Sequence, residues 1–432
     1  MKFETVKTVI LIVLIATSLL LTFGMWNYQP NYKSLNNSPA NATSLNGSEE
    51  FIWTLIEPNQ AIFHIGNHHY GFSNPHDCSS FFQEIKDWGL NDFTTEDTTV
   101  EADSPSDYDM ELRFPTPLPM EVMDGIFKLN TSNVDLPTWS FEEVYYSLNE
   151  DSQTVSVEFL SIDGRAKATA VIEEKNFYEL LQSYIDPVDL MELALFNEGA
   201  SDIYIPKDKV SLSRQTKTVS PIEPNDLVDV LFQDPSIVRQ STSSNRGITY
   251  FTDSSQLRVT QGGALMEFVS PAGDIAEPLF AEDLLNKSIA HINSYSGWTD
   301  DYKLMDINVN YNYISYQMHY LSYPVFGQFS TLEQIWGQRL IEYQRPLFRI
   351  DNDNFLNENT VELSSGEDII YYLTSDSNYE LENIKDIQLG YQLNYKSSER
   401  LAVFDPSWFI LYGSDWIAIN PYEEEINLQG GD

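Results

Sequence analysis

A cluster of histidines and a cysteine gives one part of the sequence the composition of a metal site. Between residues 64 and 78 lie four of the six histidines and the only cysteine, namely His64, His68, His69, His76 and Cys78. Imidazole and thiolate groups are the usual protein ligands of zinc and copper. The composition of this cluster therefore makes extracellular metal or ligand sensing one candidate function.

The residues around these histidines favour a simpler interpretation. The segment from His64 to Gly71 is typical of a strand, a turn and a second strand. On alternating strand positions His64 and His68 share a face and His69 does not. We therefore expect a polar hairpin with exposed imidazoles. Metal binding by His64, His68, His76 and Cys78 is the alternative.

The sequence carries none of the usual catalytic motifs. No G-x-S-x-G, S-x-x-K, H-E-x-x-H or phosphate-binding loop occurs in the chain. With 65 carboxylates some pair always falls at a suggestive spacing, so spacing alone supports no acid and base assignment. We predict a protein that is not an enzyme and has no cofactor. The alternative is a wall-directed hydrolase without a recognised motif.

Composition and charge restrict the partners. The 432 residues, 42% of them hydrophobic, are enough for two to three domains. Sixty-five Asp and Glu against 24 Lys and Arg give a net charge of −41, which disfavours nucleic acid and anionic lipid headgroups as partners. A single cysteine cannot form an internal disulfide, so packing must hold the fold together.

The N-terminus contains a candidate membrane anchor. Residues 9–26 carry no charge, and as a helix they would span about 27 Å, enough to cross the hydrocarbon core. Lys2 and Lys7 precede this segment, while Trp26 and Tyr28 follow at the expected interface. We predict cytoplasmic residues 1–8, a transmembrane anchor at residues 9–27 and a single-pass protein of the cell membrane whose C-terminal body is extracellular. A cleaved signal peptide is the alternative.

The rest of the chain divides into a linker and a folded body. Residues 28–50 are rich in Asn and Ser and should form a flexible linker. The body has the pattern of an α+β fold with antiparallel sheets. A polar stretch at residues 213–225 suggests a boundary, so we predict three α+β domains, at residues 51–212, 213–345 and 346–432.

Several elements of the body can be located from the pattern. Capping signals and apolar stripes predict helices at residues 80–88 and 176–185. Alternation predicts strands, the last two as a hairpin, at residues 110–114, 140–148, 155–160 and 166–172. An acidic stretch at residues 91–109 is expected to be a solvated loop.

The C-terminal half shows a weak internal repeat. Residues 306–313 resemble residues 386–393 at an offset of 80. Each copy follows a helix candidate, at residues 281–292 and 366–374, and precedes a strand around a proline. A duplication of a helix-strand-strand unit would explain this pattern, with a bulge or reversal between Tyr313 and Ile314.

Short segments along nearly the whole chain resemble the YycH regulatory proteins of Gram-positive bacteria. The opening K-F-E-T-V-K-T, its apolar segment and W-N-Y-Q-P at residues 26–30 are similar to that family. Further similar segments are M-E-L-R-F-P from residue 110, P-L-P from 117, Y-F-T-D from 250, G-W-T-D from 297, E-Y-Q-R-P from 342 and P-S-W-F from 406.

The resemblance implies a non-enzymatic accessory protein of the YycG (WalK) sensor histidine kinase. This kinase belongs to a two-component system that controls cell-wall homeostasis. It further implies a single-pass YycI-like partner and contact between the transmembrane helices. In lipid such contact needs small and polar residues. Ser18 and Thr22 form such a patch, and Ala16 and Trp26 are further candidates for the contact with the kinase helices. The alternative is that the hydroxyls of Ser18 and Thr22 donate to carbonyls of their own helix.

Overall fold

The computed structural model describes the following residues: 7, 14, 15, 17, 18, 44–97, 108–130, 135–184, 190–199, 201–243, 247–271, 277–375 and 379–421. The chain divides into two compact units, Met1–Ala42 and Thr43–Asp432. The five described residues of the first unit are helical, and the rest of the expected anchor at residues 9–27 lies outside the described residues. Within the described part of the chain, no helix is long and apolar enough to cross a membrane.

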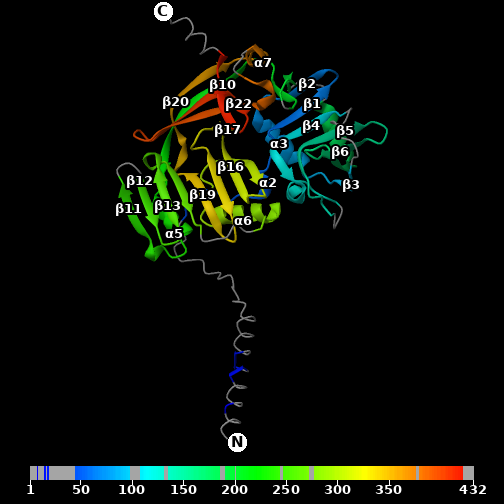
Figure 1. Ribbon diagram of the computed structural model, residues 1–432. Helices are drawn as coiled ribbons and strands as arrows, with labels where there is room; N and C mark the ends of the chain where they lie inside the picture. The colour runs from blue at the N-terminus through cyan, green and yellow to red at the C-terminus, as the bar shows by residue number, and fades with distance from the viewer. Residues whose placement is uncertain are drawn as a thin grey trace, which may run out of the picture. The chain divides into compact units, whose positions relative to one another are not determined.

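The N-terminal half of the second unit is built on an antiparallel sheet. Its strand order is β3-β7-β6-β5-β4-β1-β2-β8-β9 (Figure 1). The strands are β1 Gln60–Ile65, β2 His68–Phe72, β3 Asn91–Asp97, β4 Met110–Pro119, β5 Ser140–Asn149, β6 Thr154–Leu160, β7 Ala166–Ile172, β8 Leu190–Phe196 and β9 Ile203–Pro206. The four predicted strands and the β6–β7 hairpin are confirmed. The predicted loop at residues 91–109 is wrong at its start, because β3 pairs with β7 as an exposed edge strand and its acidic side chains stay in solvent.

Four short helices accompany this sheet: α2 Ile52–Leu55, α3 Pro75–Ile85, η1 Met120–Gly125 and α4 Lys175–Tyr184. Helix α3 begins earlier than predicted because Asn74 caps it, accepting a hydrogen bond from the His76 amide, and Pro75 occupies the first turn. Its apolar face, including Phe81 and Phe82, is buried against the sheet. Helix α4 confirms the helix predicted from residue 176.

The C-terminal half forms a second, larger sheet. The order is β11-β12-β13-β14-β19-β18-β16-β17-β21-β22-β10-β20, with β15 on β16 and β23 on β22. The strands are β10 Val210–Pro221, β11 Arg239–Ser243, β12 Gly247–Phe251, β13 Gln256–Thr260, β14 Leu265–Val269, β15 Tyr302–Asn308, β16 Tyr313–Tyr320, β17 Tyr323–Phe326, β18 Thr331–Trp336, β19 Leu340–Pro346, β20 Phe348–Leu363, β21 Ile384–Lys396, β22 Leu401–Tyr412 and β23 Asp415–Ile419. The β17–β21 pair is parallel, so the sheet is antiparallel-rich rather than purely antiparallel.

Helices cover the second sheet at several places. They are α5 Pro224–Leu231, η2 Pro235–Ile237, η3 Gln261–Gly263, α6 Ala281–Asn293, α7 Gly366–Ser375 and η4 Leu381–Asn383. Helix α6 confirms the helix candidate at residues 281–292 and buries Leu284, Leu285 and Ile292. Its first N–H group, on Ala281, donates to Glu121 Oε2 at 3.0 Å, so η1 caps it from the other half of the chain.

The structure does not confirm the internal repeat. Both predicted helices are present as α6 and α7, and each precedes an antiparallel strand pair. However, residues 306–313 cross the turn between β15 and β16, whereas residues 386–393 lie inside the single strand β21. The two similar segments therefore occupy different structures. The reversal that we expected between Tyr313 and Ile314 falls slightly earlier, before β16 begins.

The stretch that we interpreted as a domain boundary is not a linker. Strand β10 occupies most of residues 213–225 and pairs with both β20 and β22. A buried apolar cluster also joins the two sheets, combining Phe196 and Ile205 with Ile387 and Trp408. Alternation of polar residues in β10 reflects a strand with one solvated face, which composition alone cannot distinguish from a linker.

Candidate functional site

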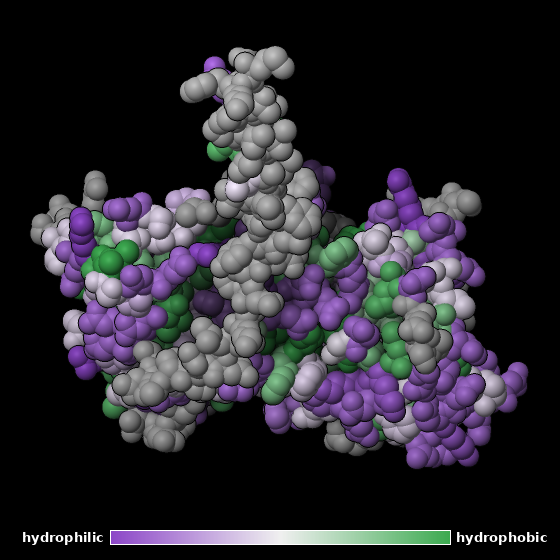
Figure 2. Space-filling model, turned by 90° about the horizontal axis from the view of Figure 1, so that it is seen from below, coloured by the Kyte–Doolittle hydropathy of each residue, from purple (hydrophilic) through white to green (hydrophobic). Residues whose placement is uncertain are grey.

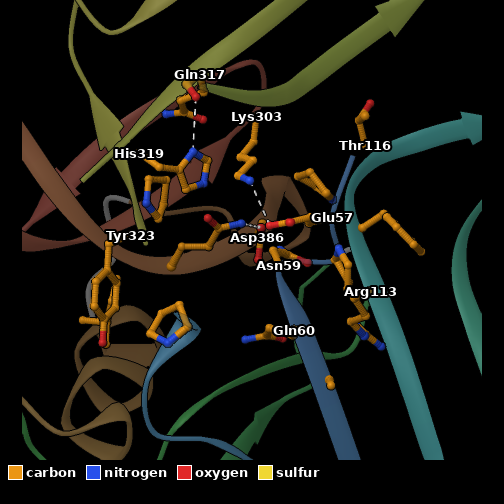
Figure 3. Close-up of a pocket in the computed structure, with 18 of the residues that line it drawn as sticks. Glu57, Asn59, Gln60, Arg113, Thr116, Lys303, Gln317, His319, Tyr323 and Asp386 are labelled. Carbon is orange, nitrogen blue, oxygen red and sulfur yellow. Dashed lines mark hydrogen bonds and ion pairs between the residues drawn. The ribbon is translucent and has the colours of Figure 1, made fainter. Parts of the chain in front are cut away.

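A large cavity lies between the two sheets. Its volume is about 1240 Å³, and strands β1, β4, β5 and β9 contribute to its wall together with β15, β16, β17 and β21. Figure 3 shows the polar side chains that gather there from both halves of the chain. Cavities of this size and mixed lining are the usual sites of ligand binding.

One basic group of the cavity is held in a buried ion pair. Lys303 of β15 lies 3.0 Å from Glu57 Oε2 and donates to the Thr54 carbonyl at 2.8 Å (Figure 3). Gln83 of α3 donates to the other Glu57 oxygen at 2.8 Å. The Lys303 and Glu57 side chains are 22% and 10% exposed, so this partly buried pair joins the C-terminal half to the segment before β1.

The second well-placed basic group is Arg113 of β4. Its Nε lies 2.8 Å from Glu111, another guanidinium nitrogen lies 3.2 Å from Glu143, and a third contact reaches the Asp202 carbonyl. Glu111 is fully buried, and this burial raises its pKa although Arg113 opposes the shift. The charge of Arg113 is therefore already balanced by protein carboxylates.

Three other carboxylates of the cavity wall, on Glu142, Asp306 and Asp386, have no such ion pair among the described residues. Glu142 of β5 and Asp386 of β21 both line the cavity, and within the described residues no Lys, Arg or His nitrogen lies within 4.0 Å of either. Glu142 is an exposed residue at the cavity wall. The partial loss of bulk water around it raises its pKa to about 7, with further contributions from the negative charges of Glu143 and Asp386. Desolvation also raises the pKa of Asp386, whose hydrogen bonds come from Gln388 and the Ile387 amide of its own strand.

The histidine cluster forms the predicted hairpin, but its side chains do not lie on the predicted faces of the strands. His64 of β1 pairs directly with His69 of β2, and their Nδ1 atoms are 2.8 Å apart. The prediction that His64 and His68 share a face is wrong because the chain reverses between them. His64 is also not exposed: its side chain is 11% accessible, and burial lowers its pKa to about 3.

The remaining metal candidates lie apart from this pair. His68 contacts Glu192 of β8 at 3.0 Å, and His76 is in the first turn of α3. Cys78 is buried inside α3, which raises the pKa of its thiol to about 12. Among the described residues, no three His, Cys, Asp or Glu side chains are arranged to hold a metal ion.

The segment that precedes α2 is attached to the body earlier than predicted. The amides of Leu45, Gly47 and Ser48 each donate at 2.9 Å to carbonyls of residues 295–298, just after α6. Asn293 then binds both the amide and the carbonyl of Glu50. We call residues 44–50 the N-terminal strap. The predicted linker at residues 28–50 therefore ends before the strap.

Two of the segments noted in the sequence meet under this strap. Arg345 of β19 is fully buried and donates to the Gly297 carbonyl at 3.0 Å and to Thr299 Oγ1 at 3.1 Å. Asp300 accepts the Ile350 amide at 2.8 Å. The E-Y-Q-R-P segment thereby holds the G-W-T-D loop that receives the strap.

Of the four transmembrane candidates, only Ser18 is a described residue, and it is helical. Ala16, Thr22 and Trp26 lie outside the described residues. Next to Ser18, Thr17 donates its hydroxyl to the Leu14 carbonyl at 3.4 Å, the bonding expected of a hydroxyl within a helix. The proposed patch stays a prediction.

Comparison with known families identifies the chain. The model of the YycH protein C-terminal domain matches residues 200–425, and that of the N-terminal domain matches residues 4–187. The chain belongs to the YycH family. The expected resemblance is thus confirmed, and the two family models meet between residues 187 and 200, near the start of β8.

Two relatives extend this result. The "two-component system WalR/WalK regulatory protein YycH" of Bacillus subtilis (strain 168) is 22% identical over 433 residues, which cover 94% of each chain. The crystal structure of YycH from Bacillus subtilis matches with a TM-score of 0.72 and 18% identity, over 87% of this chain and 99% of that one. This structural likeness confirms the α+β fold.

Sequence reasoning missed the residues of the cavity. Arg113, Glu142, Lys303 and Asp386 are spread over some 270 positions and share no spacing motif. Arg113 alone stood within a segment that resembled the family. Because the tertiary fold brings these residues together, no local pattern could have selected them from 65 carboxylates and 24 basic side chains.

Proposed function

We propose that this chain is a non-enzymatic, membrane-anchored regulator of a sensor histidine kinase of the YycG/WalK type. It acts with a YycI-like single-pass partner, through contacts in the membrane and outside it, in the control of cell-wall homeostasis. Residues 9–27 are the anchor, the N-terminus is cytoplasmic, and Thr43–Asp432 is extracellular. The family match over residues 4–187 and 200–425 is the observation that carries the proposal.

Other observations support this role. The related Bacillus subtilis protein is named as a regulatory protein of the WalR/WalK two-component system. Residues 9–26 form an uncharged segment long enough to cross a bilayer, with Lys2 and Lys7 on the side that the positive-inside rule keeps in the cytoplasm. The strap also supports it, because hydrogen bonds at residues 45–50 would connect an anchor to the rigid end of α6.

A comparison of three forms of the chain tests this function in cells. The full chain, residues 1–43 alone and residues 43–432 alone would be expressed in a strain lacking the protein, and output of the kinase target genes measured. We expect the full chain to change this output and the free body to fail, because lateral contact needs a shared membrane. An equal effect of the free body secreted into the medium would contradict the anchor.

Two substitutions test the contact within the membrane. Ser18→Leu with Thr22→Leu should weaken kinase association at least about fivefold in a membrane two-hybrid assay, because close helix packing needs small residues. The control is Val13→Leu with Leu20→Ile, which helical spacing places about half a turn away. Unchanged association of the Ser18/Thr22 variant would contradict this contact and leave the extracellular contacts to explain binding.

A further inference from the structure

The cavity between the two sheets has no role in the proposed regulation, yet uncharged polar side chains from both halves of the chain line it. Four of them are Asn59, just before β1, Gln60 of β1, Gln317 of β16 and Tyr323 of β17 (Figure 3). The amide nitrogen of Gln60 donates to the Tyr204 carbonyl at 2.8 Å. That of Gln317 donates to the Val325 carbonyl at 2.9 Å. These two bonds hold both glutamine side chains in place at the wall.

These four side chains keep hydrogen-bonding capacity that the protein does not use. Among the described residues, none donates to the amide oxygen of Gln60 or Gln317. Within the same residues, the side-chain amide of Asn59 and the hydroxyl of Tyr323 have no hydrogen-bond partner either. Amide and hydroxyl groups of this kind bind water or the polar groups of an uncharged ligand.

Aromatic rings form another part of the wall. Trp53 is 45% exposed and stacks on Phe51, with 4.7 Å between ring centroids and 4° between the planes. Trp416 of β23 also lines the cavity, and its ring lies 4.9 Å from that of Phe326. Flat aromatic faces are suitable partners for the apolar C–H faces of sugar rings.

The charged groups of the wall do not select a ligand of one sign. Lys303 is paired with Glu57 at 3.0 Å, and Arg113 with Glu143 at 3.2 Å. The lining side chains that have no ion pair within 4.0 Å among the described residues include both signs: Lys86 and Lys385, and Glu142, Asp306 and Asp386. A cation or an anion would therefore meet repulsion as well as attraction.

We propose that this cavity binds an uncharged oligosaccharide, with Gln317 and Tyr323 bonded to its hydroxyl groups and Trp53 packed against a sugar ring. A hydroxyl group donates and accepts, so it can match an amide oxygen, an amide nitrogen or a phenol. The volume of about 1240 Å³ exceeds the 300 to 1,000 Å³ typical of pockets for drug-sized molecules, so several sugar rings fit. Binding at this site does not depend on whether the chain regulates a kinase.

Such a ligand would contact both halves of the chain. Trp53, Asn59 and Gln60 belong to the N-terminal half, whereas Gln317 and Tyr323 belong to strands of the second sheet. A ligand that binds only the folded chain stabilises it in proportion to its concentration and affinity. Saturation with the saccharide should therefore raise the unfolding temperature.

Cellotetraose and maltotetraose are suitable probes, since both are uncharged glucose tetramers and they differ only in linkage. Polyethylene glycol of similar mass is the matched comparator, because it is uncharged but has no sugar rings and hydroxyls only at its ends. Binding would be measured by calorimetry on the full chain in nanodiscs of zwitterionic lipid, with empty nanodiscs as the blank. We expect at least one tetrasaccharide to bind with a dissociation constant of about 1 mM or tighter, and at least about tenfold more tightly than polyethylene glycol.

Substitutions locate the site. Tyr323→Phe removes one hydroxyl and should weaken saccharide binding about threefold to tenfold. Trp53→Ala removes the aromatic face and should weaken binding at least about fivefold. The controls are Tyr371→Phe and Tyr311→Ala, at positions 73% and 71% exposed that do not line the cavity, and both should bind like the parent. The unfolding temperature of each variant without ligand shows that the variant is folded.

Three outcomes would overturn the proposal. They are no binding of either tetrasaccharide at millimolar concentration, equal binding of polyethylene glycol, and parental affinity in both folded variants, Tyr323→Phe and Trp53→Ala. Each of these results concerns the cavity alone. Regulation of the kinase is measured separately, by the output of its target genes, so the two proposals can fail independently.

Discussion

At the scale of residues, His64 belongs to a largely buried polar network of the N-terminal sheet. His64 Nδ1 contacts His69, and His64 Nε2 lies 4.0 Å from the buried Glu111. Tyr108 and Tyr204 stack edge-on against the same ring. The folded protein therefore disfavours a proton on His64, and burial is the main cause of its lowered pKa.

This network predicts a loss of stability in mild acid. Between pH 6.5 and about 3 the unfolded chain binds a proton at residue 64 that the folded chain refuses, so the free energy of unfolding falls as pH decreases. From pH 7 to pH 5 the protonation of His64 in the unfolded chain should lower the free energy of unfolding by about 2 kcal/mol.

Urea unfolding of the parent and of His64→Gln at both pH values measures this contribution. Between pH 7 and pH 5 the free energy of unfolding of the variant should fall by about 2 kcal/mol less than that of the parent. His68→Gln, whose side chain is 62% exposed, is the surface control. An identical pH dependence for the parent and His64→Gln would show that another group, such as the buried His291, is responsible.

At the scale of elements, the strap is attached through the end of one helix. Asn293 is the last residue of α6, and its side chain holds Glu50 at both backbone atoms and accepts Trp298 Nε1 at 2.6 Å. A Cβ at Gly47 would lie 2.2 Å from the Trp298 carbonyl oxygen, so the strap has room only for glycine there. Few apolar contacts support the strap besides the buried Leu45.

Asn293→Ala should therefore release the strap without unfolding the body. Loss of these hydrogen bonds should cost about 1 to 2 kcal/mol locally, equivalent to roughly fivefold to thirtyfold faster exchange of the Gly47, Ser48 and Glu50 amides. Hydrogen exchange with mass spectrometry measures this. Asn286→Ala, on the same helix but bound only to Glu282, is the control. Equal protection in both variants would mean that the backbone bonds alone hold the strap.

At the scale of the whole molecule, charge is the dominant feature. The net charge is −41, and hydrophilic side chains cover much of the face shown in Figure 2. Like charges at this density repel one another in the compact state. The ion pairs of the cavity, such as Lys303 with Glu57, are partly buried and so are less sensitive to salt.

Salt should therefore stabilise this protein. Raising NaCl from 0.05 to 0.5 M should increase the unfolding temperature by a few degrees, since screening weakens the repulsion more than it weakens the buried pairs. Scanning calorimetry would measure the change, with an equal osmolarity of sucrose as the control for exclusion effects. A lower unfolding temperature at high salt would mean that exposed ion pairs outweigh the repulsion.

Local pattern was sufficient for several elements that have one buried face. The helix candidate at residues 281–292 and the alternation in β6 and β7 each depend on neighbours a few residues away. The same rules failed where distant partners decide. Strand β10 is a strand because β20 and β22 pair with it, although its own residues are as polar as those of a linker.

The sequence by itself determined the acidic charge, the uncharged N-terminal segment, several helices and strands and, through dispersed segments, the family. Only the tertiary structure decided that His64 meets His69 rather than His68, that Arg345 supports the loop under the strap, and that Glu142 and Asp386 share a cavity. The physical reason is the separation along the sequence over which each effect acts. Periodicity and capping act within a few residues, whereas the contacts of Arg345 and of the cavity join segments far apart in the sequence. The His64–His69 contact depends on the residue at which the hairpin reverses, which periodicity does not specify.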